Sequence, residues 1–173
     1  MKDIFIVVPT LNPNKEILDE FLLKLTKEFE NVLVFDDGCR EEYKDYFKKM
    51  EKKGIIVLHH YVNLGKGRAM KSAFNYLMNE YPNLKGVVTA DSDGQHSVQD
   101  IKKCAKEVLK HPDSLILGCR NFDAKNVPTR NRFGNKTTRN VLKLFVGVGV
   151  TDTQTGLRGL PKEVMMKFMK IKY

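Results

Sequence analysis

The sequence predicts an α/β fold: a Rossmann-like, mainly parallel sheet with helices on both faces. Short apolar runs alternate with amphipathic helical stretches along the chain. Each connection is long enough to hold a helix, which is the usual way to join parallel strands. The strands read as nearly unbroken apolar runs, as expected for a sheet covered on both faces. Because the chain has 173 residues, we expect a single domain over 1–173.

Apolar runs bounded by turn-forming residues predict the strands. The first run ends at a proline, the second at Asp36-Asp37-Gly38 and the third at a glycine-rich turn. The fourth is interrupted by Asp91-Ser92-Asp93-Gly94, and the fifth ends at Gly118. In chain order the predicted strands are 4–9, 31–35, 55–60, 86–90 and 115–118.

Apolar residues at helical spacing predict a helix after each of the first four strands. The second helix carries its tyrosines and Phe47 on one face and is ended by Gly54. The predicted helices are 14–29, 41–53, 66–79 and 98–110. After Gly118 the pattern weakens. There we expect a polar loop at 120–135, a basic helix at 136–146 and a Gly- and Thr-rich turn region at 147–161.

Composition excludes several classes of protein. With 42% hydrophobic and 29% charged residues, the chain is neither disordered nor a fibrous repeat. No apolar run approaches the roughly 18 residues of a membrane span, and residues 1–3 lead into a strand without a signal-peptide pattern. Cys39, Cys104 and Cys119 are far apart, so neither a disulfide framework nor a zinc site is indicated. We therefore expect a cytoplasmic protein.

The net charge of +9 suggests a polyanionic partner. Between positions 120 and 143, a single acidic residue faces a group of basic ones: Arg120, Lys125, Arg130, Arg132, Lys136, Arg139 and Lys143. A basic amphipathic helix at 136–146 fits an anionic membrane surface, and nearby arginines can grip a phosphate through paired hydrogen bonds. From charge alone, an ordinary solvated surface helix is the slightly favoured alternative.

Polar clusters follow each of the first four strands, at the end where α/β sheets bind ligands. Each cluster alone is typical of an ordinary turn. Because the carboxyl ends of parallel strands share one edge of the sheet, the four together predict one cleft. The clusters are Pro9-Thr10-Leu11-Asn12, Asp36-Asp37-Gly38, Asn63-Leu64-Gly65-Lys66-Gly67 and Asp91-Ser92-Asp93-Gly94-Gln95-His96.

The Asp91-Ser92-Asp93 step is the most informative of these clusters. Two carboxylates this close repel each other unless a positive group lies between them. A divalent cation with oxygen ligands would serve, and Gln95 adds a carbonyl oxygen. Mg²⁺ or Mn²⁺ with open positions would then bind nucleotide phosphates. The alternative is a solvated acidic turn. Lys66, at a glycine-flanked helix start, is equally suited to a phosphate or to solvent.

In this order the motifs resemble family 2 glycosyltransferases with the GT-A fold. The resemblance is greater to the polyprenyl-phosphate sugar transferases, the group similar to dolichol-phosphate mannosyltransferase. It runs from position 4 to about 161 and also includes Gly118-Cys119-Arg120 and Asp152-Thr153-Gln154-Thr155-Gly156-Leu157-Arg158-Gly159. It implies a metal-dependent, inverting transfer of a hexose from a UDP- or GDP-linked sugar. The implied acceptor is a polyprenyl phosphate at the inner face of the cell membrane.

The resemblance also implies roles for individual residues. Pro9, Asn12 and Asp36 would hold the nucleoside, and Asp91, Asp93 and Gln95 would bind Mg²⁺ or Mn²⁺. The whole expected donor-binding set is Pro9, Asn12, Asp36, Asp37, Lys66, Asp91, Ser92 and Asp93. Arg120 would lie near the phosphates, and Arg130 or Arg132 would grip the acceptor phosphate. Asp91, Asp93 and Asp152 are the expected catalytic residues. Asp152 would act as a base only for a hydroxyl acceptor, because a phosphate acceptor is already ionised.

The chain departs from the family at two points, and several alternatives stay open. Cys39 replaces the serine that usually follows Asp-Asp-Gly, and family members continue past Gly159, so we expect a domain truncated at its C-terminus. The alternatives are a family 2 enzyme acting on a soluble or cell-wall glycan, an inactive donor-binding remnant, and a related nucleotidyltransferase. A nucleic-acid-binding module would explain the charge but not Asp91 and Asp93, so we expect no nucleic acid partner. A homo-oligomer is also left open.

Overall fold

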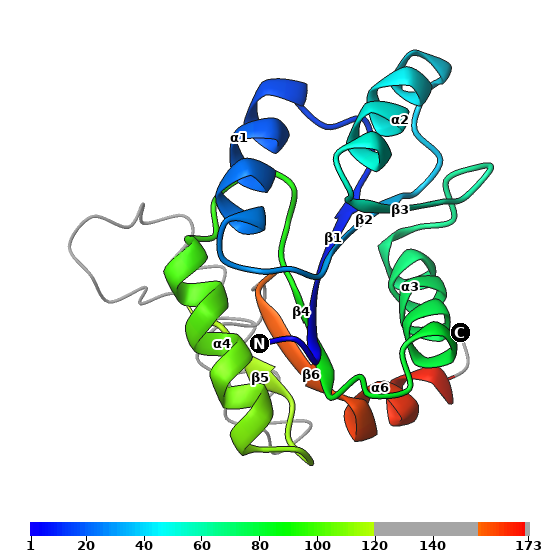
Figure 1. The fold of residues 1–173 in the computed structure, drawn as a ribbon. Coiled ribbons are helices and arrows are strands. Elements are labelled where there is room, and N and C mark those ends of the chain that lie inside the picture. Colours follow the sequence, from blue (N-terminus) through cyan, green and yellow to red (C-terminus); the bar gives the residue numbers. More distant parts are fainter. Residues whose placement is uncertain (120–155, 172–173) are drawn as a thin grey trace, which may run out of the picture.

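The computed structural model describes residues 1–119 and 156–171, and in these ranges a mixed sheet of six strands forms the centre of the fold (Figure 1). The strand order is β3-β2-β1-β4-β6-β5. β1 pairs in parallel with β2 and β4, and β2 pairs in parallel with β3. β6 runs antiparallel to both β4 and β5. The strands are β1 (Ile4–Thr10), β2 (Val32–Asp36), β3 (Ile56–His59), β4 (Gly86–Thr89), β5 (Ile116–Leu117) and β6 (Arg158–Pro161).

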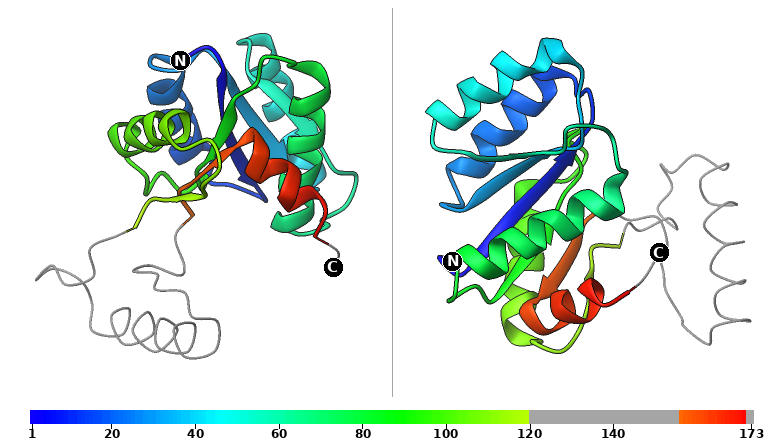
Figure 2. Two further views of the ribbon diagram at one scale, coloured as in Figure 1. Left: turned by 90° about the horizontal axis from the view of Figure 1, so that it is seen from below. Right: turned by 90° about the vertical axis from the view of Figure 1, so that its right-hand side faces the viewer.

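Helices cover both faces of this sheet (Figure 2). Buried side chains of α1, α2 and α4 pack on one face, and those of α3 and α6 pack on the other. The helices are α1 (Lys15–Thr26), α2 (Lys44–Lys52), α3 (Lys66–Glu80), α4 (Val98–Lys110) and α6 (Lys162–Met169), with a 3-10 turn, η1 (Glu41–Tyr43), before α2. The predicted α/β class, with a mainly parallel sheet between two helical layers, is therefore confirmed.

The strands divide their side chains between the two layers because successive residues point to opposite faces. In β1, Ile4, Ile6 and Val8 join the core beneath α1, α2 and α4, whereas Phe5 and Val7 join the core beneath α3. All residues of β1, β2 and β4 are buried. Burial on both faces explains why these strands read as continuous apolar runs in the sequence.

Side-chain caps fix where two helices begin, and thereby the loops before them. The Asn14 side chain accepts a hydrogen bond of 3.1 Å from the backbone N–H of Ile17 at the start of α1. Ser97 Oγ accepts one of 3.1 Å from the backbone N–H of Asp100 at the start of α4. Such caps satisfy backbone donors that the first turn leaves free. The loops after β1 and β4 are therefore each anchored at both ends.

The turn region expected at 147–161 is wrong for residues 158–161, which form β6. This strand lies between β4 and β5 and pairs Val87 with Leu160. Its Gly159 allows α4 to approach, because a Cβ there would lie 2.4 Å from Val108 Cγ2. Because this close packing needs a glycine, the segment lacks the continuous apolar run that predicts the other strands. Helix α6 was not predicted. The loop at 120–135, the basic helix at 136–146 and residues 147–155 lie outside the described residues.

Gly86 offers a test of the packing between β4 and β6. A Cβ at this position would lie 2.6 Å from the Leu160 carbonyl oxygen and 2.9 Å from Pro161 Cα, and backbone atoms cannot rotate away. We expect Gly86→Ala to lower the free energy of unfolding by about 2 kcal/mol, measured by urea denaturation. Gly54→Ala has open space but a φ of +84°, and should cost about 1 kcal/mol. Equal losses in the two variants would contradict the close approach at Gly86.

Candidate functional site

A cleft of about 410 Å³ lies at the carboxyl ends of the parallel strands. The loops after β1, β2, β3 and β4 all contribute to it, so each of the four polar clusters singled out in the sequence reaches the same cleft. Its lining residues are Pro9, Thr10, Leu11, Asp37, Asn63, Gly65, Lys66, Asp91, Ser92 and Asp93. The strand register explains this meeting, because Thr10 pairs with Asp36 and Asp36 pairs with His59 across neighbouring strands.

Six of the eight expected donor-binding residues line the cleft, and Asn12 and Asp36 do not. Asn12 has a left-handed backbone, with φ of +48°, and its Oδ1 accepts a 2.9 Å hydrogen bond from the backbone N–H of Arg40. Asp36 Oδ1 accepts a 2.7 Å hydrogen bond from the backbone N–H of Cys39. Asn12 thereby holds the loop after β1 against the loop after β2, and Asp36 stabilises the turn after β2 from within. Their expected contact with a nucleoside stays a prediction.

Cys39 belongs to the same loop and acts there as an uncharged polar group. Its sulfur accepts a 3.0 Å hydrogen bond from the backbone N–H of Asn12. Burial, together with the neighbouring Asp36 carboxylate, raises the pKa of the Cys39 thiol to about 12. The thiol therefore stays protonated at neutral pH and links two loops. A serine hydroxyl offers the same type of contact, which explains why cysteine is tolerated where the family usually has serine.

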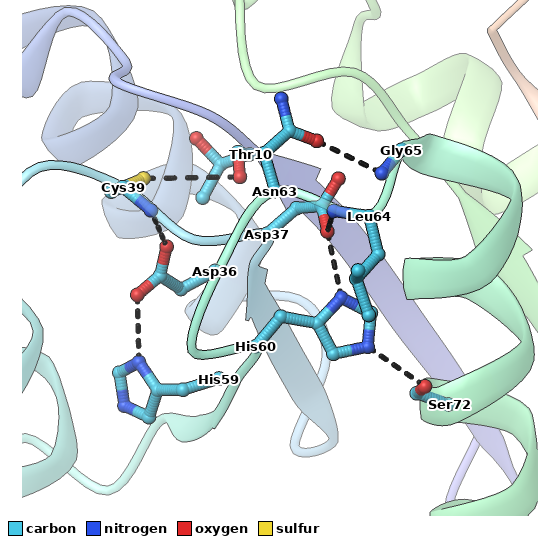
Figure 3. Close-up of polar contacts among 10 residues, drawn as sticks. All are labelled: Thr10, Asp36, Asp37, Cys39, His59, His60, Asn63, Leu64, Gly65 and Ser72. Atoms are coloured by element: carbon cyan, nitrogen blue, oxygen red, sulfur yellow. Dashed lines mark hydrogen bonds and ion pairs between the residues drawn. The ribbon is translucent and has the colours of Figure 1, made fainter.

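Two histidines that the sequence analysis did not single out hold the adjacent aspartates (Figure 3). His59 Nδ1 lies 2.8 Å from Asp36 Oδ2, and His60 Nδ1 lies 2.7 Å from Asp37 Oδ1. The pairing of β2 with β3 brings them together, since Asp36 and His59 are register partners. Placing the two predicted parallel strands side by side would have indicated this contact, because both pairs come from strand ends.

Among the carboxylates described in the cleft, Asp91 has the pKa that is shifted furthest from its ordinary value. Lys66 Nζ forms an ion pair with Asp91 Oδ1, and His96 Nε2 lies 3.8 Å from Oδ2. His96 and Lys66 together hold the pKa of Asp91 well below its usual range, against the opposing effect of burial. In this structure the positive group beside the carboxylate pair is therefore Lys66. Gly156 packs directly on the same carboxylate, and a Cβ there would lie 1.9 Å from Oδ2.

The carboxylates of Asp91 and Asp93 are the groups of the cleft best suited to a divalent cation. Asp93 Oδ1 also accepts a 3.0 Å hydrogen bond from the backbone N–H of Gln95. Gln95 itself lines a neighbouring cavity of about 740 Å³, which shares Asp93 with the cleft. Within residues 1–119 and 156–171, no three His, Cys, Asp or Glu side chains gather into a metal site. An ion held by these two carboxylates would need other ligands, such as a bound phosphate and water.

Thr10 carries a buried hydroxyl without a partner in the described ranges, on a residue that lines the cleft. The residue is 4% exposed, and its Oγ1 has no hydrogen-bond partner within the described ranges. A buried hydroxyl without a partner costs about 1–3 kcal/mol. Buried polar groups are usually satisfied by protein, water or ligand. The Thr10 hydroxyl is therefore a polar group beside the cleft that a rotation of its side chain would offer to a ligand.

The residues expected on the acceptor side are not among those described. Arg120, Arg130, Arg132 and Asp152 all lie between 120 and 155, outside the described residues. Their roles stay predictions. None of the helices in the described part of the chain is long and apolar enough to span a bilayer.

Comparison with known proteins connects this cleft to a family. The family model described as glycosyl transferase family 2 matches residues 5–167. A protein of unknown function from Methanocaldococcus jannaschii is 34% identical over 171 residues, which cover 96% of this chain and 68% of that protein. The UDP-N-acetylglucosamine–dolichyl-phosphate N-acetylglucosaminyltransferase of Methanococcus voltae is 25% identical over 181 residues, covering 95% and 71%.

A solved structure shares the fold. The glucosyl-3-phosphoglycerate synthase of Mycobacterium tuberculosis, crystallised with Mn²⁺, UDP and phosphoglyceric acid, superposes with a TM-score of 0.67 at 17% identity. The match covers 94% of this chain but only 56% of the synthase, so the chain spans little more than half the length of that protein. The family model, in contrast, covers nearly all of the chain. From the order of its motifs, its sheet and this match, the chain belongs to glycosyl transferase family 2 and has the GT-A fold.

Proposed function

We propose that this chain carries the catalytic site of a metal-dependent, inverting glycosyltransferase. It would move a hexose from a nucleotide diphosphate sugar to a polyprenyl phosphate. The observation that carries the proposal is the convergence of Lys66, Asp91 and Asp93 on one cleft at the carboxyl edge of the sheet. The name of the Methanococcus voltae relative, with a UDP-sugar and a dolichyl phosphate, supports both substrate classes. The UDP and Mn²⁺ in the mycobacterial synthase support a nucleotide bound with a metal.

Lys66 and the amino terminus of α3 would bind the donor's diphosphate. Lys66 is the first residue of this 15-residue helix, where unpaired backbone N–H groups favour an anion. Lys66 would leave Asp91 for a phosphate oxygen, and Asp91 and Asp93 would then be free to hold Mg²⁺ or Mn²⁺. The ion, when bound, supplies positive charge that stabilises the leaving diphosphate. Asp37 and Thr10 lie at the β1–β2 side of the cleft, where the nucleoside would sit.

The acceptor side would need no strong general base. A phosphate acceptor is already ionised near neutral pH, so its oxygen can attack without losing a proton to the protein. This agrees with the histidines around the cleft, since His59, His60 and His96 each lie beside an aspartate. Arg130 or Arg132 would grip the acceptor phosphate and Arg120 would lie near the donor phosphates. The basic segment at 136–146 would lie on the anionic, cytoplasmic face of a membrane.

Replacing Asp93 tests the metal assignment. We expect UDP-N-acetylglucosamine with Mn²⁺ to raise the melting temperature of the wild-type chain more than the nucleotide sugar alone, because ligands of the folded state stabilise it. Asp93→Asn should lose the increment due to Mn²⁺ and keep the ligand-free melting temperature. Asp113→Asn, an exposed site outside the cleft, is the matched control and should behave as wild type. A full Mn²⁺ increment in Asp93→Asn would contradict the assignment.

Replacing Lys66 tests its exchange between Asp91 and phosphate. Lys66→Met removes the cation that competes with a metal for Asp91, so Mn²⁺ alone should bind more tightly. The gain should reach at most about fivefold, because the side chains of Lys66 and Asp91 are 54% and 35% exposed and solvent screens the pair. UDP should bind more weakly to the same variant. Titration calorimetry measures both affinities.

The matched control for this variant is Lys24→Met, which breaks the ion pair with Glu20 on α1. It should change neither the Mn²⁺ nor the UDP affinity. If Lys66→Met bound UDP as tightly as the wild type, the role of Lys66 as a phosphate ligand would be wrong.

A further inference from the structure

Two neighbouring aspartate–histidine pairs lie at the carboxyl ends of β2 and β3, and only one of them reaches the cleft. The His59–Asp36 pair and the His60–Asp37 pair have nearly equal Nδ1–Oδ distances of 2.8 and 2.7 Å. Asp37 lines the cleft, whereas Asp36 does not. The His59 side chain is 44% exposed and the His60 side chain is 12% exposed. The chain therefore contains a buried pair at the cleft and a more exposed pair of the same composition beside it.

The two carboxylate oxygens of Asp37 differ in their hydrogen bonding. Oδ1 accepts from His60 Nδ1 at 2.7 Å and from the backbone N–H of Leu64 at 3.1 Å. No group in residues 1–119 and 156–171 donates to Oδ2, and this side chain is 6% exposed. In Figure 3 the second oxygen points away from His60. Because an oxygen of this kind has two lone pairs, Oδ1 is fully used and Oδ2 is the oxygen available to a ligand.

His60 is itself fixed by a second element. Its Nε2 lies 2.9 Å from Ser72 Oγ on α3, and its ring packs edge-on against Phe35 with centroids 4.7 Å apart. A carboxylate only accepts, so Nδ1 carries the proton that faces Asp37, and the Ser72 hydroxyl forms the hydrogen bond at Nε2. Ser72 thereby holds the far side of the ring, so that its Nδ1–H stays directed at Asp37. Neither His60 nor Ser72 lines the cleft, so this Asp–His–Ser chain positions a group and does not itself react.

We propose that His60 is a positioning residue which sets the nucleobase preference of the donor site. It makes Asp37 present one carboxylate oxygen to the base. Uracil has one N–H between two carbonyl groups on its hydrogen-bonding edge, so a single acceptor oxygen of Asp37 is enough to pair with it. Guanine presents two adjacent N–H groups and needs both oxygens of a carboxylate, one of which is already occupied. This inference rests on the proposed function, since it takes the cleft to be the nucleotide site.

The test compares the affinities for UDP and GDP, measured by titration calorimetry at one fixed Mn²⁺ concentration. We expect the wild type to prefer UDP. His60→Phe keeps an aromatic ring against Phe35 but removes the donor, so it should weaken UDP binding about tenfold and affect GDP less. The ratio of the two affinities should then fall at least about fivefold. His60→Asn keeps an N–H near the position of Nδ1 and should retain most of the preference.

His59→Phe is the matched control, because it removes the equivalent donor from Asp36. It should leave the ratio of the two affinities unchanged. Ser72→Ala removes only the hydroxyl that holds Nε2 of His60, and should lower the UDP preference about threefold. This variant keeps the test decisive if His60→Phe does not fold. In turnover assays His60→Asn and Ser72→Ala should change the KM for the donor and leave kcat unchanged, which indicates a role in binding.

The outcomes separate this inference from the proposed function. A wild type that binds UDP in a Mn²⁺-dependent manner, with a preference over GDP that His60→Phe or Ser72→Ala does not alter, overturns the role of His60 alone. The same holds for a wild type that prefers GDP. A wild type that binds neither nucleotide overturns the proposed function and this inference with it.

Discussion

The carboxyl edge of the sheet concentrates negative charge, and the structure depends on how each carboxylate there is compensated. Parallel pairing brings the ends of β1, β2 and β4 together, and Asp36, Asp37, Asp91 and Asp93 follow from them. Like charges at such short range destabilise a fold unless donors or cations offset them. Histidines and backbone N–H groups compensate the first two, and Lys66 compensates Asp91. The loops take their conformations largely from these contacts.

The fold and the position of the cleft were predictable because both follow from local patterns and one topological rule. Apolar runs and helical spacing defined the elements up to Gly118, and parallel strands must carry their carboxyl ends at one edge. The strand β6 was missed because its pairing with β4 joins residues about 70 positions apart, such as Val87 and Leu160. Its short sequence has no pattern of its own. Antiparallel pairing to a distant segment leaves no signal in either segment alone.

The histidines of the site were missed for a related reason. His59 and His60 close an ordinary apolar strand, and each finds its partner 23 positions earlier in the chain. Nothing near them in the sequence distinguishes a histidine that holds a carboxylate from one exposed to solvent. For Asn12 and Asp36, the sequence indicated the motif but not the position of the side chain. Their motifs were recognised, but the Asn12 side chain contacts the loop after β2, the Asp36 side chain contacts its own loop and His59, and neither lines the cleft.

The pairs Asp36–Asp37 and Asp91–Asp93 show how carboxylates are placed beside the cleft after a strand ends. Successive residues point in opposite directions as a strand ends, so Asp36 contacts Cys39 in the loop after β2 and His59 on β3, while Asp37 lines the cleft. The first stabilises the turn that carries the second. Asp91 and Asp93 both line the cleft together with Ser92 between them, because all three lie in the turn after β4 and not in the strand itself. The adjacent aspartates after β2 therefore divide support and cleft lining between them, whereas the turn after β4 presents both of its carboxylates to the cleft.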